Sequence, residues 1–271
     1  MPLVSSKYLS ENIDRVKIID CSWHMPNVNR DSKKEYDLNH IANSIFFDLD
    51  ENSRRDTDLP HMLVKKKEWE KIVSSLGIKN SDEIVIYDNS DVISSCRCWY
   101  NFIYYGHDIN LVNVLNGGLS KWILDGYNTD NKKIEITQTN YISKENKEFV
   151  KNKKQIDDNI IKEEFLVVDA RSKERFEGKV KEPRPGLKSG SIPKSKCIPF
   201  TEVVNGNKTF KTKDELKYIF KSNLDISKDK DVVFSCGSGV TACVLAFAYY
   251  LISDNYLPKI YDGSWAEYGK F

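Results

Sequence analysis

The chain has 271 residues, of which 41 are Lys or Arg and 40 are Asp or Glu, so its formal net charge is +1. A nearly neutral chain with 40% hydrophobic residues is typical of a globular protein, and its charge favours neither nucleic acid nor a membrane as a partner. No apolar run approaches membrane-spanning length, and residues 1–12 lack the pattern of a secretory signal or a transit peptide. We therefore expect a cytoplasmic protein, with a mitochondrial location as the alternative.

The six cysteines are irregularly spaced, and a chain of this length does not need disulfide bonds to stabilise its fold. We therefore expect all six to be reduced thiols. Cys96-Arg97-Cys98 lacks the second ligand pair that a zinc site needs. The sequence therefore predicts no metal site.

Short apolar segments alternate with helical stretches along the chain. In order, they are an apolar segment at 18–22, a helical one at 69–76, apolar ones at 84–88 and 167–171, a helical one at 215–222, an apolar one at 231–234 and a helical one at 240–251. This alternation is typical of α/β proteins with a mainly parallel sheet.

Three segments of the chain occur twice. Residues 18–22 resemble 167–171, residues 84–88 resemble 232–236, and residues 114–122 resemble 260–268. The matches keep the same order at a nearly constant separation of about 150 residues, which indicates a duplicated domain. We expect one copy at 1–130, a polar linker at 131–158 and a second copy at 159–271.

The most informative motif is the loop from Ser235 to Ala242, which follows a buried strand and opens a helix. Gly237 and Gly239 allow the backbone to curl so that successive amides point at one spot. Cys236 would lie in that cup at the positive end of a helix, where thiolate is favoured over thiol. Most free cysteines are buried and inert, but a structural cysteine does not need converging amides. We therefore predict that Cys236 is a sulfur nucleophile.

The first copy has Asp88 at the position of Cys236. Only the second copy can therefore perform thiolate chemistry, and the first copy is expected to shape the site from outside.

These motifs resemble the two-domain rhodanese, or sulfurtransferase, family over nearly the whole chain. The loop 236–242 is similar to the active loop of 3-mercaptopyruvate sulfurtransferases, residues 261–268 to the family's C-terminal signature, and residues 36–45 to its N-terminal one. The resemblance implies two tandem rhodanese-like domains, the first inactive and the second catalytic.

The residues after the cysteine favour one substrate class. Family members that prefer thiosulfate carry Arg-Lys there, whereas this chain has the uncharged Gly237 and Ser238. Such a loop suits a thiol whose carboxylate is held elsewhere. The resemblance assigns that role to Arg175 and Arg184, because a planar guanidinium captures a carboxylate with two hydrogen bonds.

A second set of residues comes from the first copy. The resemblance maps Asp50 and His61 onto the family's proposed Ser-His-Asp relay, with Ser238 as the serine. His61 would pass a proton through the Ser238 hydroxyl while Asp50 fixes its tautomer. A lone histidine more often has a structural role, which is how we interpret His24, His40 and His107.

The chain departs from the family at two turns. Residues 40–44 read His-Ile-Ala-Asn-Ser where His-Ile-Pro-Gly-Ala is usual, and the second copy has Gly-Ser-Ile-Pro-Lys at 190–194, with serine at the usual histidine. We expect both departures to affect local stability more than chemistry.

The sequence thus predicts an enzyme that moves sulfur from 3-mercaptopyruvate through a Cys236 persulfide to a thiol acceptor such as thioredoxin or a small thiol. Pyruvate leaves, and no cofactor is needed. The substrate and the persulfide would be held by backbone amides of the loop, at Gly237, Gly239, Val240 and Thr241.

Three alternatives remain. One is thiosulfate:cyanide sulfurtransfer on the same fold, and another is a non-catalytic persulfide carrier or interaction module. A cysteine-dependent phosphatase is disfavoured, because its Cys-x₅-Arg motif would need arginine where this chain has Ala242.

Overall fold

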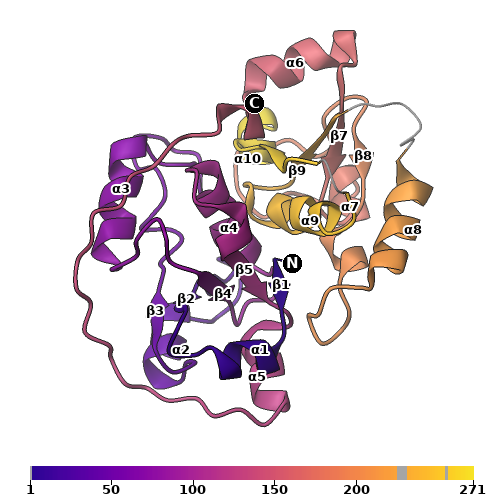
Figure 1. Cartoon of the computed structure of the whole chain (residues 1–271). Helices are drawn as coiled ribbons and strands as arrows, with labels where there is room; N and C mark the ends of the chain where they lie inside the picture. Colours follow the sequence, from indigo (N-terminus) through magenta and orange to yellow (C-terminus); the bar gives the residue numbers. More distant parts are fainter. Residues whose placement is uncertain (1, 225–230, 254–255) are drawn as a thin grey trace. The chain divides into compact units, whose positions relative to one another are not determined.

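The computed structural model describes residues 2–224, 231–253 and 256–271. The chain forms two compact units (Figure 1). Unit 1 comprises Met1–Arg55, Leu63–Asn146 and Gly206–Thr209, and unit 2 comprises Asp56–Met62, Lys147–Asn205 and Phe210–Phe271. Each half of the chain therefore contributes a short segment to the unit that the other half builds.

Unit 1 contains a five-stranded parallel sheet in the order β1-β5-β4-β2-β3. Its strands are β1 (Leu3–Val4), β2 (Lys17–Asp20), β3 (Ser44–Phe46), β4 (Ile84–Tyr87) and β5 (Val112–Leu115). The sheet is flanked by α1 (Ser6–Glu11), α2 (Ser32–Leu38), α3 (Lys66–Ser75), α4 (Ser95–Tyr104) and α5 (Gly118–Leu124), with a 3₁₀ turn, η1, at Ile109–Leu111.

Unit 2 contains a second five-stranded parallel sheet in the order β6-β10-β9-β7-β8. Its strands are β6 (Val150–Lys151), β7 (Phe165–Asp169), β8 (Lys196–Cys197), β9 (Asp231–Ser235) and β10 (Lys259–Tyr261). The helices are α6 (Lys153–Lys162), α7 (Lys173–Phe176), α8 (Lys213–Asn223), α9 (Val240–Tyr250) and α10 (Ser264–Tyr268), with 3₁₀ turns η2 (Lys147–Phe149) and η3 (Phe200–Val203).

The two sheets have the same strand order, and each strand of unit 1 has a counterpart in unit 2. This confirms the α/β class and the duplication. The central strands are apolar because both faces of a parallel sheet are covered, and every residue of β4 is buried. Helix α9 is apolar on all sides, and nine of its eleven residues are buried, so it belongs to the core of unit 2.

The range 131–158, which we expect to join the copies, has neither helix nor strand from 131 to 146. Its remainder holds η2, β6 and the start of α6, where Asn152 and Gln155 form a capping box.

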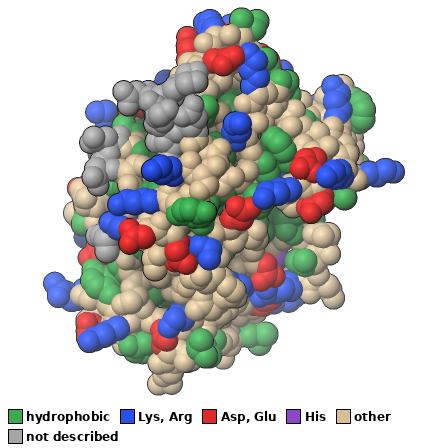
Figure 2. All heavy atoms as spheres, turned by 90° about the vertical axis from the view of Figure 1, so that its right-hand side faces the viewer, with side chains coloured by type: hydrophobic (Ala, Val, Ile, Leu, Met, Phe, Trp, Pro, Cys, Tyr) green, Lys and Arg blue, Asp and Glu red, His purple; other side chains and the backbone are tan. Residues whose placement is uncertain are grey.

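On the face shown in Figure 2, basic and acidic side chains are interspersed over the surface, as the near balance of charges in the sequence leads one to expect. No helix among the described residues is both long and apolar enough to span a bilayer.

Candidate active site

Cys236 lies directly after β9, and two hydrogen bonds from α10 fix the backbone around it. Trp265 N donates to Cys236 O at 2.9 Å, and Ala266 N donates to Gly237 O, also at 2.9 Å. The side chain of Cys236 is buried, with 2% of the residue exposed. The C-terminal segment 264–266 therefore holds the start of the loop in place.

The loop ends at Gly239, the N-cap of α9, whose φ of +80° lies in the left-handed region that glycine adopts without a steric cost. Val240 and Thr241 are the first residues of α9, so their amides have no partner within the helix. Such amides at a helix N-terminus favour an anion. This geometry suits a thiolate or a persulfide on the preceding cysteine.

The structure brings both predicted arginines to the loop. A Cβ atom added at Gly237 would lie 3.2 Å from Arg175 Nη2 and 3.6 Å from Arg184 Nη1. Arg184 Nη2 also donates to Ser238 Oγ at 3.3 Å. Arg175 and Arg184 are separated from the loop by more than 50 residues in sequence, so only the fold brings these two cations beside an uncharged loop.

Arg175 is held by Glu182, whose side chain is 2% exposed. Arg175 Nε donates to Glu182 Oε1 at 3.2 Å, and Nη2 donates to Oε2 at 2.5 Å. Glu182 Oε1 also accepts from Arg171 Nη1 at 2.7 Å. Arg171 is itself paired with Asp169 at the end of β7 and lies over the Trp265 ring, 4.5 Å from its centroid. A buried ionic network therefore sets the position of one arginine.

Ser238 contacts the predicted histidine. His61 Nδ1 lies 3.0 Å from Ser238 Oγ, although the two residues are 177 positions apart in the chain. His61 is 3% exposed and has a φ of +61°, in the left-handed region that non-glycine residues adopt infrequently. Both residues belong to unit 2, because the segment 56–62 is part of it.

Asp50, the third member of the expected relay, belongs to unit 1. There its Oδ2 accepts a hydrogen bond from Trp23 Nε1 at 3.0 Å. Its action on His61 stays a prediction.

Two other cysteines lie in surroundings that keep them as thiols. Burial raises the pKa of Cys197 to about 12. Burial also raises the pKa of Cys21 well above its ordinary value. Neither is suited to act as a nucleophile near neutral pH.

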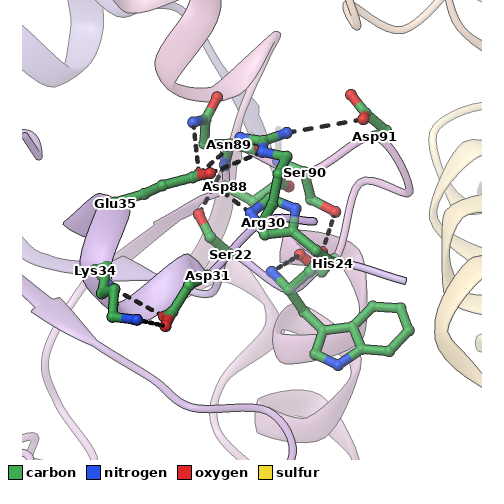
Figure 3. Close-up of polar contacts among 12 residues, drawn as sticks. Ser22, His24, Arg30, Asp31, Lys34, Glu35, Asp88, Asn89, Ser90 and Asp91 are labelled. Atoms are coloured by element: carbon green, nitrogen blue, oxygen red, sulfur yellow. Dashed lines mark hydrogen bonds and ion pairs between the residues drawn. The ribbon is translucent and has the colours of Figure 1, made fainter. Parts of the chain in front are cut away.

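In unit 1, Asp88 occupies the sequence position that matches Cys236. Figure 3 shows Asp88 among its polar neighbours. Leu119 N donates to Asp88 O at 2.9 Å, just as Trp265 N donates to Cys236 O. The Asp88 carboxylate accepts from Ser90 N at 2.8 Å and from Ser95 N at 3.0 Å. Amides of the first copy therefore already bind a carboxyl group, supplied by the side chain of Asp88.

An arginine–glutamate pair also accompanies the loop of the first copy. Arg30 Nε and Nη2 donate to the two oxygens of Glu35, each at 2.7 Å, and Arg30 Nη2 also donates to Asn89 O at 3.0 Å. Figure 3 shows His24 and Asn89 beside the same network. Each unit therefore has an arginine–glutamate pair near the loop that follows its central strand. In unit 2 that loop contains Cys236, whereas in unit 1 Asp88 stands at the matching position.

Within the part of the chain that the structure describes, no group of three or more His, Cys, Asp or Glu side chains could hold a metal ion. The candidate site thus consists of a cysteine, backbone amides, two arginines, a serine and a histidine.

Sequence reasoning assigned no role to Glu182 or Ser264. Glu182 anchors Arg175, and Ser264 Oγ lies 3.2 Å from the amide nitrogen of Cys236. Glu182 stands only two positions before Arg184, but this spacing does not reveal which arginine it contacts.

Comparison with known proteins agrees with this arrangement. Residues 5–125 and 152–270 each match the model of the rhodanese-like domain. The chain belongs to the rhodanese family. It is 39% identical to thiosulfate/3-mercaptopyruvate sulfurtransferase 1, mitochondrial, of Arabidopsis thaliana, over 98% of this chain and 76% of that protein. It is 34% identical to human 3-mercaptopyruvate sulfurtransferase, over 98% of this chain and 91% of that one.

Among solved structures, SseA from Escherichia coli superposes with a TM-score of 0.87 at 31% identity, covering 98% of this chain and all of that one. These relatives confirm the predictions of two rhodanese domains and of a sulfur-transferring enzyme. The chain is a sulfurtransferase.

Proposed function

We propose that this sulfurtransferase takes sulfur from 3-mercaptopyruvate and passes it through a persulfide on Cys236 to a thiol. The observation that carries the proposal is the approach of Arg175 and Arg184 to the uncharged loop at Gly237. Two guanidinium groups suit the carboxylate and carbonyl of an α-keto acid. The relatives named as 3-mercaptopyruvate sulfurtransferases support the same donor.

In the first half-reaction, the Cys236 thiolate attacks the sulfur of 3-mercaptopyruvate and a sulfur–sulfur bond forms. The carbon–sulfur bond breaks, and its electron pair goes to carbon, so that the enolate of pyruvate leaves. Arg175 and Arg184 stabilise the negative charge that moves toward the carbonyl oxygen. The amides of Gly237, Gly239, Val240 and Thr241 are proposed to hold the anionic sulfur.

The enolate carbon then takes up a proton to give pyruvate. We assign this proton transfer to Ser238 and His61, whose side chains lie 3.0 Å apart. Asp50 is the proposed third member, acting on the tautomer of His61. This assignment rests on the resemblance to the family together with the Ser238–His61 contact.

In the second half-reaction a thiol takes the outer sulfur, and Cys236 returns as a thiolate in a ping-pong cycle. Thioredoxin and small thiols are the proposed acceptors. A cytoplasmic location remains the proposal, with the mitochondrion as the alternative, since the name of one relative includes "mitochondrial".

Thiosulfate is the second candidate donor. Curated relatives at 33–39% identity include proteins named for thiosulfate as well as for 3-mercaptopyruvate. Positions 237 and 238 carry no cation, so the positive charge near the loop comes from Arg175 and Arg184. Their planar guanidinium groups match a carboxylate, which favours the keto acid.

Pyruvate release from 3-mercaptopyruvate in the presence of a reducing thiol tests the proposal, with thiosulfate assayed in parallel. We expect a higher kcat/KM for 3-mercaptopyruvate. We also expect Cys236→Ser to lower pyruvate release at least about 1000-fold, because the attacking thiolate is lost. Cys197→Ser serves as the control and should stay near the parent rate. Preference for thiosulfate would contradict the proposed donor, and turnover of neither donor would favour a persulfide carrier.

A further inference from the structure

Unit 2 contains a hollow of about 440 Å³ beside the candidate active site. Its walls come from the segment 56–62, the loop after Arg184, helix α10 and the residues that follow it. The lining residues used below are Asp58, Pro60, Arg184, Leu187, Ala266 and Lys270. A space of this size suits a small molecule.

The hollow adjoins the Cys236 loop but is not lined by Cys236. Arg184 lines the hollow, and its guanidinium also donates to Ser238 Oγ at 3.3 Å. Ala266 lines it and donates its amide to Gly237 O. Pro60 immediately precedes His61. A molecule in the hollow would therefore lie next to the loop that carries Cys236 and would contact Arg184.

The chemistry of the walls selects an anion with an apolar part. Arg184 and Lys270 are cationic, and Pro60 and Leu187 provide apolar surface. Lys270 Nζ donates to Asp58 at 2.6 Å, but these side chains are 43% and 82% exposed. An ion pair this exposed contributes little stability, so a ligand carboxylate can compete with Asp58 for Lys270.

We infer that this hollow binds the sulfur acceptor as a small thiol that carries a carboxylate. The inference rests on the proposed function, and specifically on its second half-reaction. Arg184 and Lys270 both line the hollow, so a carboxylate bound there after pyruvate has left would lie near two cations. The acceptor thiolate attacks the outer sulfur of the Cys236 persulfide, the sulfur–sulfur bond to Cys236 breaks, and Cys236 leaves as a thiolate.

The acceptor step can be measured apart from the donor step. Cys236 of the full chain is loaded with inorganic polysulfide, which supplies sulfane sulfur without a carboxylate, and excess polysulfide is removed. Transfer is then followed in a single turnover by intact-protein mass spectrometry. The two acceptors are 3-mercaptopropionate, which has a carboxylate, and 2-mercaptoethanol, which has none. Comparing each variant with the parent for one thiol at a time removes the difference in thiol acidity.

We expect Lys270→Ala to lower the second-order rate constant for 3-mercaptopropionate about three- to fivefold, the effect of one exposed charge, and to leave that for 2-mercaptoethanol unchanged. Asp58→Asn should raise the rate constant for 3-mercaptopropionate, because it removes the competing carboxylate. Lys154→Ala is the matched control, since Lys154 is an exposed lysine paired with Asp158 on α6 and does not line the hollow. It should change neither rate constant.

Equal effects of Lys270→Ala on both thiols, or no effect on either, would overturn the inference. Transfer to thioredoxin that outpaces both small thiols, with neither small thiol sensitive to Lys270, would also overturn it. A chain that passes polysulfide sulfur to thiols but releases no pyruvate from 3-mercaptopyruvate would contradict only the proposed donor. A Cys236 that takes up no sulfur from polysulfide would contradict both.

Discussion

Glu182 illustrates how a buried charge can serve a site without touching the reacting atoms. Its two oxygens hold Arg175 in a bidentate pair, and Arg171 neutralises it from the other side. A buried carboxylate between two arginines is stable only while both partners are present. We therefore regard Glu182 as a positioning residue for the donor.

Replacing Glu182 with Gln should release Arg175 from its bidentate contact. We expect KM for 3-mercaptopyruvate to rise about tenfold, which corresponds to about 1.4 kcal/mol of lost binding, with a smaller change in kcat. Loading of Cys236 by polysulfide should stay near the parent rate, because that donor has no carboxylate to clamp. Glu177→Gln is the control, since Glu177 is half exposed and pairs with Lys179. A similar rise in KM for both variants, or an equal loss of polysulfide loading, would contradict this role.

Asp20, at the end of β2, has a buried carboxyl group in unit 1. Burial raises its pKa from the ordinary value to about 6, while hydrogen bonds from Ser22 oppose that rise. The folded state therefore binds the proton more tightly than the unfolded chain does. This group costs nothing below about pH 4, and its unfavourable contribution grows as the pH rises to about 6.

Replacing Asp20 with Asn removes this titration. We expect the free energy of unfolding of the variant, relative to the parent, to increase by about 2–3 kcal/mol between pH 4 and pH 7. Urea unfolding at the two pH values measures the difference, and any constant cost of the substitution cancels. The control is the exposed Asp158, whose pKa is lowered by its hydrogen bond from Lys154, so its Asn variant should change in the opposite sense. A relative stability of the Asp20 variant that is independent of pH would contradict the assignment.

At the level of elements, the two departures from the family pattern have a common geometry. Asn43 and Lys194 both adopt left-handed backbone conformations, with φ of +64° and +63°. Asn43 stands where the usual His-Ile-Pro-Gly-Ala motif has glycine. In this region the Cβ of any L-residue lies close to the following carbonyl oxygen, but the short polar side chain of asparagine can offset that cost by hydrogen-bonding locally, and lysine cannot do so. The second turn therefore carries the larger strain.

Lys194→Gly should relieve that strain and raise the free energy of unfolding by about 0.5–1 kcal/mol, after allowance for the greater freedom of glycine in the unfolded chain. Asn43→Gly should raise the free energy of unfolding by a smaller amount. Thermal or urea unfolding of both variants checks the order, and donor turnover should be unchanged. The explanation fails if Asn43→Gly gains as much as Lys194→Gly, or if neither gains stability.

At the scale of the whole molecule, the two units do not coincide with the two halves of the chain. The segment Asp56–Met62 comes from the first half but belongs to unit 2, and Gly206–Thr209 comes from the second half but belongs to unit 1. His61 lies in the first of these segments. The unit that holds Cys236 therefore also holds His61, although His61 comes from the other repeat.

A chain of residues 147–271 alone should therefore lack activity. It keeps Cys236, Arg175 and Arg184 but loses His61, so we expect pyruvate release about 100-fold or more below that of the full chain. Full-length His61→Asn is the matched comparison, because asparagine tolerates the positive φ at this position. The circular dichroism of the shortened chain reports whether its sheet has formed. Parent-level activity in a folded half-chain would contradict the role of His61.

Much of the fold follows from local pattern. The helical stretch predicted at 240–251 is α9 at Val240–Tyr250, and the apolar segment at 231–234 lies within β9 at Asp231–Ser235. The repeated segments fall on corresponding strands of the two sheets, and the rhodanese fold is confirmed. Periodicity and repetition are properties of the chain itself, so these features need no knowledge of tertiary contacts.

For the candidate site, some features could be predicted from the sequence and others are seen only in the structure. The Cys236 loop is readable from sequence because its glycines, cysteine and helix start are contiguous. Other contacts join residues from different segments. His61 lies 3.0 Å from Ser238, and Arg175 donates a hydrogen bond to Glu182. Sequence alone determined the class of enzyme and predicted Cys236 as its nucleophile. Only the tertiary structure decided which side chains meet it, because such contacts depend on how distant segments pack and leave no spacing in the chain to detect.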